Sequence, residues 1–277
     1  MIPSSPATSA AQLTLGAINV YPVKSAGGVP QRSWDIDGFG LRYDRRWMVV
    51  DADGDFLSQR IHPKLALVRP ELRDGTLVLR APALPELAIP TTPDGGESIR
   101  VTVWGGETLG TLVSPAADEW FGSLLGHGCR LVFMRDETVP PVRADYAFDG
   151  ERTSFTDGFP FLLITEGSLA DLNRRLASPL PMNRFRPNLV VTGAEPFAED
   201  GWRRIRIGPV TFRVAKPCPR CVMTTVDQTL GIPTSIEPLR TLATFRRNAE
   251  GQVEFGQNLL HAGTGRIEVG MPVELLD

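Results

Sequence analysis

The segment Lys216-Pro-Cys-Pro-Arg-Cys221 carries the residues with the clearest capacity for chemistry in this sequence. A proline lies on each side of Cys218 and restricts the backbone, so we expect both cysteines to be held in place. Lys216 and Arg220 bring positive charge close to the thiols and favour the thiolate. The thiolate is the form that binds soft metal ions or attacks electrophiles, so the segment predicts a metal ligand or a nucleophile.

Three other interpretations of this cysteine pair are open from the residues alone. A structural zinc site needs about four ligands, and the rest of the chain adds only Cys129 and the unpaired His62, His127 and His261. A thioredoxin-like redox pair would open a helix in a βαβ unit, whereas this motif follows a predicted hairpin. Two inert, buried cysteines are the third interpretation.

Other segments have the donors that an anionic ligand needs. Tyr21-Pro-Val-Lys-Ser25 places a lysine and a hydroxyl before two glycines, although the order of a phosphate-binding P-loop is missing. Asp44-Arg-Arg-Trp47 and Asn183-Arg-Phe-Arg-Pro-Asn188 supply arginines, whose forked donors suit phosphate. Ser58-Gln-Arg60 is similar. A surface turn is the simpler interpretation of the Lys24-Ser25 segment, and it is equally compatible with the arginine segments.

A glycine-bearing turn lies in Thr156-Asp-Gly-Phe-Pro-Phe161, where a ligand could approach the backbone closely. No paired carboxylates with an acid and base arrangement and no G-x-S-x-G motif are present in the sequence.

Bulk composition excludes several classes of protein. The 277 residues include 29 basic and 32 acidic ones, for a net charge of −3, so the basic footprint of a nucleic-acid-binding protein is missing. Three cysteines are too few for a disulfide scaffold. Residues 1–11 have neither the basic start nor the apolar run of a secretion signal, and no stretch approaches the roughly 20 apolar residues of a membrane helix. We therefore expect a loose N-terminal tail, no membrane contact and a cytoplasmic location.

The elements that must position these residues are short, because 27 glycines and 24 prolines interrupt the chain. Asp51-Ala-Asp-Gly-Asp55 is typical of a hairpin turn. Residues 140–155 are polar and indicate a linker or an active-site loop. In the first half we expect strands at 13–21, 46–50, 66–69, 76–80, 98–103 and 130–134, with a short helix at 118–125.

The second half opens with the apolar residues 161–164. A helix at 166–176 follows, for which Thr165 and Ser168 are competing caps. We further expect a strand at 188–192, a hairpin of 203–207 and 210–214 around Gly208-Pro209, an extended stretch near Thr224, a helix at 238–245 and a last strand at 272–276. The fold class is therefore α+β and β-rich, with a β-barrel-like N-terminal domain at 12–138 packed on a second β-barrel domain at 139–277 and a few short helices.

Five segments, taken in their order along the chain, resemble one family. They are Tyr21-Pro-Val-Lys-Ser25, Asp44-Arg-Arg-Trp47, Ser168-Leu-Ala-Asp-Leu-Asn173, Phe185-Arg-Pro-Asn188 and Cys218-Pro-Arg-Cys-Val-Met-Thr-Thr-Val-Asp227. The set is similar to the MOSC proteins that have an N-terminal MOSC β-barrel domain, the class of the amidoxime-reducing components. The resemblance covers residues 13–276.

The resemblance implies a molybdenum cofactor and assigns residues to it. Cys221 would be the thiolate ligand of the metal, and Cys218 would not be a ligand. The resemblance implies eight contacts to the cofactor, and near one of them this chain has Gly158-Phe159 where the family has hydroxyl residues. These contacts are Lys24, Ser25, Arg45, Asp157, Gly158, Arg186, Asn188 and Arg220. Asp227, six residues after Cys221, is a second candidate catalytic residue as a proton relay, although an aspartate there is equally typical of a turn.

The implied activity is the reduction of small N-hydroxylated compounds, hydroxylamines and amidoximes, by a molybdenum-cofactor enzyme. The cofactor carries the difficult chemical step, and the protein supplies orientation and charge. The four cysteines of an iron–sulfur site are missing, so we expect electrons from a separate redox protein. An alternative from another class is a sulfur-carrier or cofactor-binding protein in which Cys221 bears a persulfide. Binding of the pyridoxal phosphate type is also left open.

Overall fold

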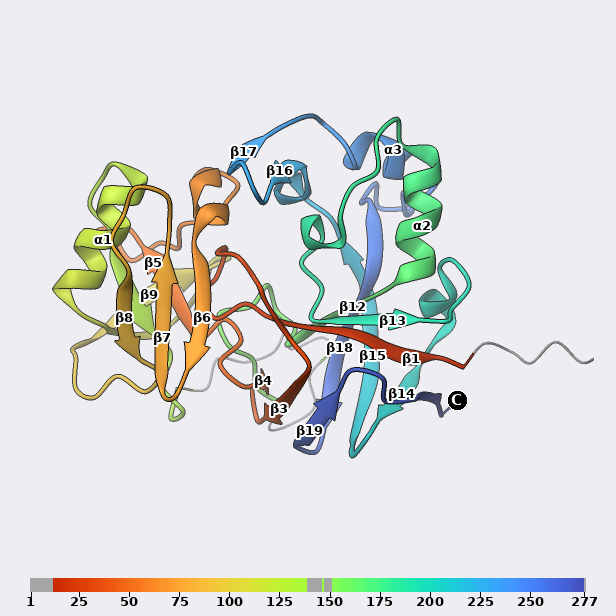
Figure 1. The fold of residues 1–277 in the computed structure, drawn as a ribbon, viewed down its shortest axis with the longest axis horizontal. Helices are drawn as coiled ribbons and strands as arrows, with labels where there is room; N and C mark the ends of the chain where they lie inside the picture. Colours follow the sequence, from red (N-terminus) through yellow and green to blue (C-terminus); the bar gives the residue numbers. More distant parts are fainter. Residues whose placement is uncertain (1–11, 139–145, 147–150, 277) are drawn as a thin grey trace, which may run out of the picture.

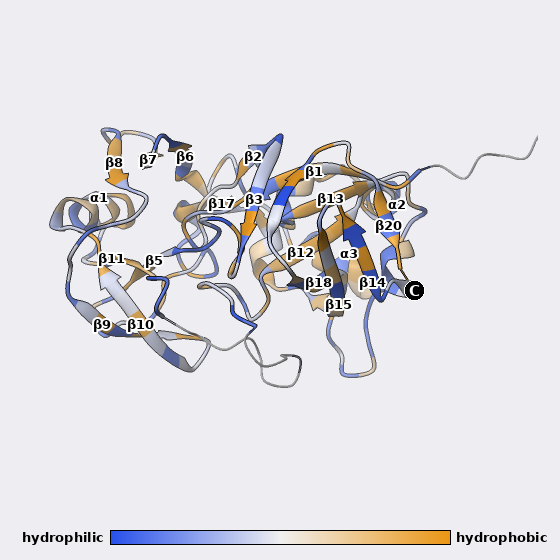
Figure 2. Ribbon diagram, turned by 90° about the horizontal axis from the view of Figure 1, so that it is seen from below, coloured by the Kyte–Doolittle hydropathy of each residue, from blue (hydrophilic) through white to orange (hydrophobic). Residues whose placement is uncertain are grey.

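The computed structural model describes residues 12–138, 146 and 151–276, and these form two lobes joined side by side (Figure 1). The two lobes are also distinct in the perpendicular view, with α1, β7 and β8 at one end and α2, α3 and β14 at the other (Figure 2). The expected N-terminal tail and most of the expected loop at 140–155 lie outside the described residues.

The second lobe is built on an eight-stranded sheet that closes into a barrel. In spatial order its strands are β2 (Val29–Gln31), β1 (Thr14–Val20), β13 (Leu189–Thr192), β12 (Phe161–Thr165), β18 (Glu254–Ala262), β15 (Val210–Pro219), β14 (Arg204–Ile207) and β20 (Val273–Leu275). A bridge between Thr14 and Pro272, beside the bond from the Val273 amide to the Leu13 carbonyl, joins the start of β1 to the start of β20 and closes the sheet. Side chains at alternate positions, such as Ile205 and Ile207, fill the interior as a pleated sheet requires.

The first lobe has a separate apolar core between two small sheets and a helix. Trp47, Leu77 and Phe121 are completely buried there. One sheet contains β5 (Trp47–Val50), β11 (Arg130–Phe133), β10 (Gly106–Leu112) and β9 (Ser98–Val103), and the other contains β6 (Arg69–Arg73), β7 (Thr76–Arg80) and β8 (Leu87–Pro90). The helix is α1 (Pro115–Leu125). The β-rich fold class with two barrel-like parts is confirmed.

The first strands of the chain pair with strands from its second half. β1 pairs with β13, and β3 (Ser33–Asp37), which also pairs with β4 (Gly40–Leu41), pairs with β19 (Gly265–Glu268). The second lobe therefore contains residues from both halves of the sequence. The division at residues 138 and 139 stays a prediction.

Two expected strands are wrong, for local reasons. Residues 63–67 form a 3-10 helix with Pro63 at its start, and the strand there begins only at Arg69. The extended stretch expected near Thr224 is the 3-10 helix η4 (Val222–Thr225). The Thr224 and Thr225 hydroxyls donate to the carbonyls three residues earlier, which favours the turn over the extended form.

Helix ends follow the side-chain chemistry. The Thr165 hydroxyl accepts the Ser168 amide hydrogen at 3.1 Å, so Thr165 caps α2 (Glu166–Arg175) and Ser168 lies within the helix. Ser114 caps α1 with Pro115 at the first helical position, three residues before the expected start. The helix expected at 238–245 is shorter and forms α3 (Leu239–Ala243). Among the described residues, no helix has the length and apolarity that a membrane span requires.

Candidate functional site

A cavity of about 740 Å³ gathers residues from both halves of the chain. This volume lies within the range of typical small-molecule and cofactor sites. The cavity is lined by all the cofactor contacts that the resemblance implies and by the expected metal ligand: Lys24, Ser25, Arg45, Asp157, Gly158, Arg186, Asn188, Arg220 and Cys221. Segments up to about 200 residues apart in sequence therefore meet at one site.

The lining of the cavity is strongly cationic. Among the described residues it contains the seven cations of Lys24, Arg45, Arg60, Arg184, Arg186, Lys216 and Arg220, and two carboxylates, those of Glu107 and Asp157. Cations in an enclosed site with few counter-charges favour an anionic ligand, because a ligand charge would offset the cost of their desolvation.

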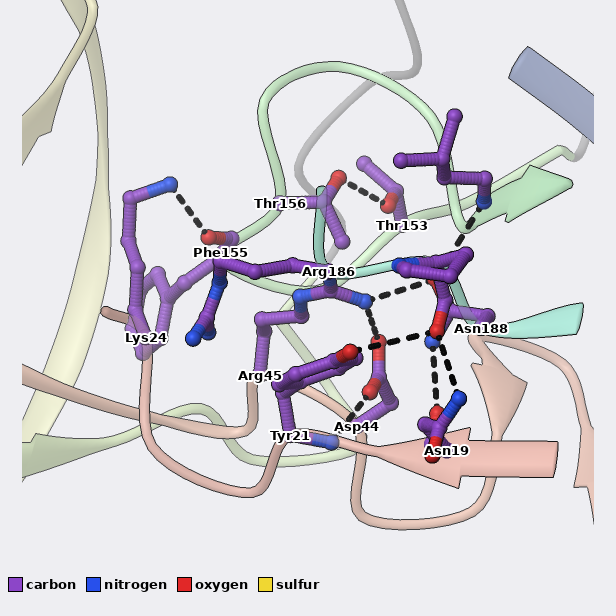
Figure 3. A network of polar contacts seen from close by, with 12 residues as sticks. Asn19, Tyr21, Lys24, Asp44, Arg45, Thr153, Phe155, Thr156, Arg186 and Asn188 are labelled. Atoms are coloured by element: carbon purple, nitrogen blue, oxygen red, sulfur yellow. Dashed lines mark hydrogen bonds and ion pairs between the residues drawn. The ribbon is translucent and has the colours of Figure 1, made fainter. Parts of the chain in front are cut away.

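Arg45 is held at the centre of this lining by a buried polar network (Figure 3). Its guanidinium donates to the Asp44 carboxylate and, at 2.8 Å, to the Asn188 side-chain oxygen. Asp44 also accepts the Tyr21 amide hydrogen at 2.7 Å, and the Arg45 guanidinium lies 4.6 Å from the Tyr21 ring centre. Asn188 is completely buried, so the network fixes the arginine before any ligand arrives.

Arg186 contacts the same Tyr21 ring as Arg45. Its guanidinium lies 4.3 Å from the Tyr21 ring centre and donates to the Ala26 carbonyl at 2.5 Å. Burial lowers the pKa of Arg186 to about 10, and the nearby charge of Arg45 acts in the same direction. A buried arginine with one carbonyl partner keeps most of its donors available to an anion.

Three residues of the anion-binding wall adopt left-handed backbone conformations. Ser25, Arg45 and Arg186 have φ values of 67°, 49° and 56°. Non-glycine residues enter this region at an energetic cost, and such residues cluster at functional sites. All three residues line the cavity.

Lys24 is almost fully buried and is held by two acceptors. Its ammonium donates to the Phe155 carbonyl at 2.8 Å and to the Asp157 carboxylate at 2.5 Å. Burial lowers the pKa of Lys24, whereas Asp157 acts to raise it. Desolvation at the cavity wall opposes the charge on Asp157, but Lys24 holds the pKa of this carboxyl well below its usual value. The ion pair with Asp157 therefore offsets part of the cost of burying the Lys24 charge.

The two cysteines of the motif have different surroundings. Cys218 lies in β15, and its sulfur accepts a hydrogen bond from Arg220 at 3.0 Å. Cys221 follows the strand, precedes η4 and lines the cavity. Cys218 also lines the cavity, but among the described residues no side chain donates to the Cys221 sulfur. The assignment of the metal to Cys221 stays a prediction that this difference supports.

The competing interpretations of the cysteines lose support in this geometry. Within the described part of the chain, no cluster of three or more histidine, cysteine or carboxylate side chains could hold a metal ion. Cys129 is buried in the core of the first lobe, and burial raises the pKa of its thiol to about 11. All three cysteines are free thiols.

Asp227 does not line the cavity. One of its carboxylate oxygens accepts the amide hydrogens of Thr229 and Leu230, and the other accepts a hydrogen bond from Arg184 at 2.7 Å. This is the bonding pattern of a turn. Gly158, in contrast, lines the cavity with a φ of 108°, which a side chain would strain.

Sequence reasoning indicated a linker or an active-site loop at 140–155, but it did not single out Ser154 within it, nor the hairpin end at Trp104. Ser154 lines the cavity with a buried hydroxyl that has no hydrogen-bond partner. Trp104 begins the turn between β9 and β10, and its indole donates to Asp157 at 2.8 Å. A tryptophan directly before Gly105-Gly106 was the available signal, because large apolar residues are uncommon in exposed turns.

The residues present fit a phosphate-bearing cofactor with a thiolate-bound metal. The unpartnered Ser154 hydroxyl and the Arg220 Nε atom, also buried without a partner, are donors that lack an acceptor. A free thiol lies in the same cavity as the buried cations. A soft metal would take the thiolate and a phosphate would take the cations.

Comparison with known proteins agrees with this chemistry. Residues 12–128 match the model of the MOSC N-terminal beta barrel domain, and residues 150–274 match that of the MOSC domain. The chain is 34% identical to mitochondrial amidoxime-reducing component 1 of Mus musculus over 95% of its length and 82% of the relative's. The Homo sapiens protein of the same name is 35% identical over 95% and 83%.

A third relative is longer than this chain. The molybdenum cofactor sulfurase of Oryza sativa subsp. japonica is 33% identical over 92% of this chain but only 33% of its own length. The expected cytoplasmic location is contradicted by these comparisons, because the amidoxime-reducing components are named as mitochondrial proteins and point to mitochondria instead.

Proposed function

The chain belongs to the MOSC family with an N-terminal MOSC beta barrel domain, and from this membership we propose that it is a molybdenum-cofactor-dependent reductase of N-hydroxylated compounds. The observation that carries the proposal is the convergence of Cys221 with Lys24, Arg45 and Arg186 on one cavity. The relatives that match over most of their length are named for amidoxime reduction.

The reaction balances with two electrons and two protons. An amidoxime, R–C(=NOH)NH₂, takes up two electrons and two protons, its N–O bond breaks, and the products are the amidine R–C(=NH)NH₂ and water. When bound at Cys221, the molybdenum cofactor would supply the two-electron chemistry. The electrons would come from a separate redox protein.

The protein's own residues would bind the cofactor and orient it in the cavity. Cys221 would hold the metal. Lys24, Ser25, Arg45 and Arg186 would hold the cofactor phosphate, supported by Asn188 through Arg45. Their geometry is set by buried partners, so they need little reorganisation when the cofactor binds.

Arg220 and Asp157 complete the set with Gly158. Arg220 donates to the Phe185 carbonyl at 2.7 Å, which fixes the backbone beside Cys221. Asp157 acts to raise the pKa of Lys24, and Gly158 lets the backbone turn at the cavity wall. A proton-relay role for Asp227 is a separate proposal, tested below.

The two cysteines provide the test, each the matched control of the other. In Cys221→Ala we expect molybdenum per chain and reduction of benzamidoxime by reduced methyl viologen to fall to background. In Cys218→Ala both should stay near the level of the unmodified protein, because Cys218 is bonded to Arg220. Equal loss in the two variants would contradict the single-ligand assignment.

A sulfur-carrier function with a persulfide on Cys221 is the alternative. The sulfurase relative gives it less support, because this chain spans only 33% of that protein. Metal-free protein that releases sulfur to cyanide would favour the carrier. The names of the relatives reported above give no support to pyridoxal phosphate binding.

A further inference from the structure

A second hollow opens on the other side of Cys221. It is a groove of about 960 Å³ beside η4, α3 and the segment 251–253. The groove and the cofactor cavity share four lining residues, Arg60, Pro219, Arg220 and Cys221. A molecule lying in the groove would therefore have one end at the proposed metal ligand.

The walls of the groove are apolar and partly open to solvent. Val222 and Ile236 are 52% and 61% exposed, and Leu239 and Val253 also line the groove. Soluble proteins rarely leave large aliphatic side chains clustered at the surface without a binding role. The groove is thus suited to the apolar body of a ligand.

The charged residues of the groove all have the same sign. Arg60, Arg220, Arg240 and Arg247 line it, and no aspartate or glutamate of the described residues does. Arg240 is paired with Glu237 at 2.8 Å. Arg247 donates to the Gly251 carbonyl at 2.7 Å, and no carboxylate of residues 12–138 or 151–276 forms an ion pair with it.

The two ends of the groove differ in what they can bind. Arg60 and Arg220 lie at the end shared with the cavity, where Arg60 stacks on Trp104 at 4.0 Å from a ring centre. Arg247 and Arg240 line the groove but not the cavity. An arginine without a carboxylate partner presents a fork that matches a carboxylate.

We propose that this groove is a substrate subsite that selects N-hydroxylated compounds with an apolar body and a terminal carboxylate. The N-hydroxy group would lie at Cys221, the body against Val222 and Ile236, and the carboxylate at Arg247 with Arg240. The inference rests on the proposed reductase function. A small substrate is favoured over a protein because the groove is hollow and continuous with the site at Cys221.

The test compares benzamidoxime with a series of 4-(ω-carboxyalkyl)benzamidoximes of increasing chain length. The molybdenum-loaded enzyme is assayed with reduced methyl viologen, so that no protein donor is needed. We expect one chain length to exceed benzamidoxime in kcat/KM. In Arg247→Gln that preference should fall roughly 10-fold through KM, about 1.4 kcal/mol, because the carboxylate loses its charged hydrogen-bond donor.

The controls separate the subsite from general charge effects. Arg174 is an exposed arginine paired with Asp171 three residues away, as Arg240 is with Glu237, so Arg174→Gln is the matched control for Arg240→Gln. Arg174→Gln should leave the preference for the carboxylate substrates unchanged, and Arg240→Gln should reduce it. Arg247→Glu should reverse the preference toward a 4-(ω-trimethylammonioalkyl)benzamidoxime.

Each failure has its own signature. If the unmodified enzyme reduces no amidoxime at all, the reductase function itself is wrong. If it reduces benzamidoxime but shows no preference for the carboxylates, or if Arg247→Gln retains that preference, the subsite is wrong. An effect of Arg247→Gln that appears only with a protein electron donor would overturn the subsite in favour of a docking surface.

Discussion

Replacement of Arg186 by methionine should separate two effects of this arginine, its effect on the stability of the cofactor-free protein and its effect on anion binding. Methionine keeps much of the side chain's length and removes its charge. Burial lowers the pKa of Arg186 to about 10. Because one pKa unit corresponds to about 1.4 kcal/mol, the charge costs the cofactor-free fold about 3 kcal/mol.

The loss of one hydrogen bond offsets part of this gain. The Ala26 carbonyl loses its donor in Arg186→Met, which costs about 1–3 kcal/mol for a buried acceptor. The left-handed backbone at this position is equally strained in both proteins. We therefore expect the cofactor-free variant to be as stable as the parent or up to about 2 kcal/mol more stable.

The assay is urea unfolding of cofactor-free protein with and without inorganic phosphate. At ten times its dissociation constant, phosphate should stabilise the parent by about 1.4 kcal/mol, and this increment should disappear in Arg186→Met. Arg174→Met, at an exposed arginine, should retain the increment. A variant that loses stability and still responds to phosphate would refute the reasoning, because Arg186 would then be a structural residue.

Three further predictions concern ionisable groups. Phosphate affinity should fall as pH rises through the lowered pKa of Lys24, and Asp157→Asn should move the midpoint of this fall to lower pH, because Asp157 raises the pKa of Lys24. The phosphate-induced change in melting temperature, followed from pH 7 to 10.5, measures both effects. An unchanged midpoint in Asp157→Asn would contradict the coupling between the two side chains. Glu199→Leu should lower the free energy of unfolding in urea by about 2–4 kcal/mol, because the carboxylate of Glu199 accepts hydrogen bonds from the buried hydroxyls of Thr165 and Ser168. A decrease below about 1 kcal/mol would show that these hydrogen bonds contribute little to stability. Asp227→Asn should reduce stability and leave the pH dependence of kcat in place, whereas a shifted pH profile would favour the proton relay.

Strands with strong alternation or clear turns were predictable from the sequence. The strands at 76–80 and 98–103 have the expected bounds, and the hairpin around Gly208-Pro209 forms as predicted. In these segments β-branched and apolar residues recur between turn-forming ones, so local preference and final structure agree.

The central strand β18 was not predictable in this way. Its sequence Glu-Phe-Gly-Gln-Asn-Leu-Leu-His-Ala includes Gly256 in a left-handed conformation and Gln257 in a buried position. It is a strand because β12 and β15 pair with it on both sides, which is tertiary context that no local window contains.

The candidate site was predictable by its residue types but not by its shape. The motifs place Lys24, Arg45 and Arg186 in three separate segments, and only the fold shows that Tyr21 lies within contact of both arginines. The adjoining groove depends on α3 and η4, whose position beside Cys221 is likewise a product of packing.

The pairing of β1 with β13 has a consequence for the order of synthesis. Thr14 emerges from the ribosome 178 residues before Thr192, the residue to which it bonds. The whole first lobe is made in between and can fold while β1 still lacks its neighbour, since domains generally fold as units during synthesis. Cutting the gene between the lobes would leave β13 with an uncovered edge, which is a site for aggregation. A second lobe produced alone should become soluble only when residues 12–41 are supplied with it, fused or as a peptide.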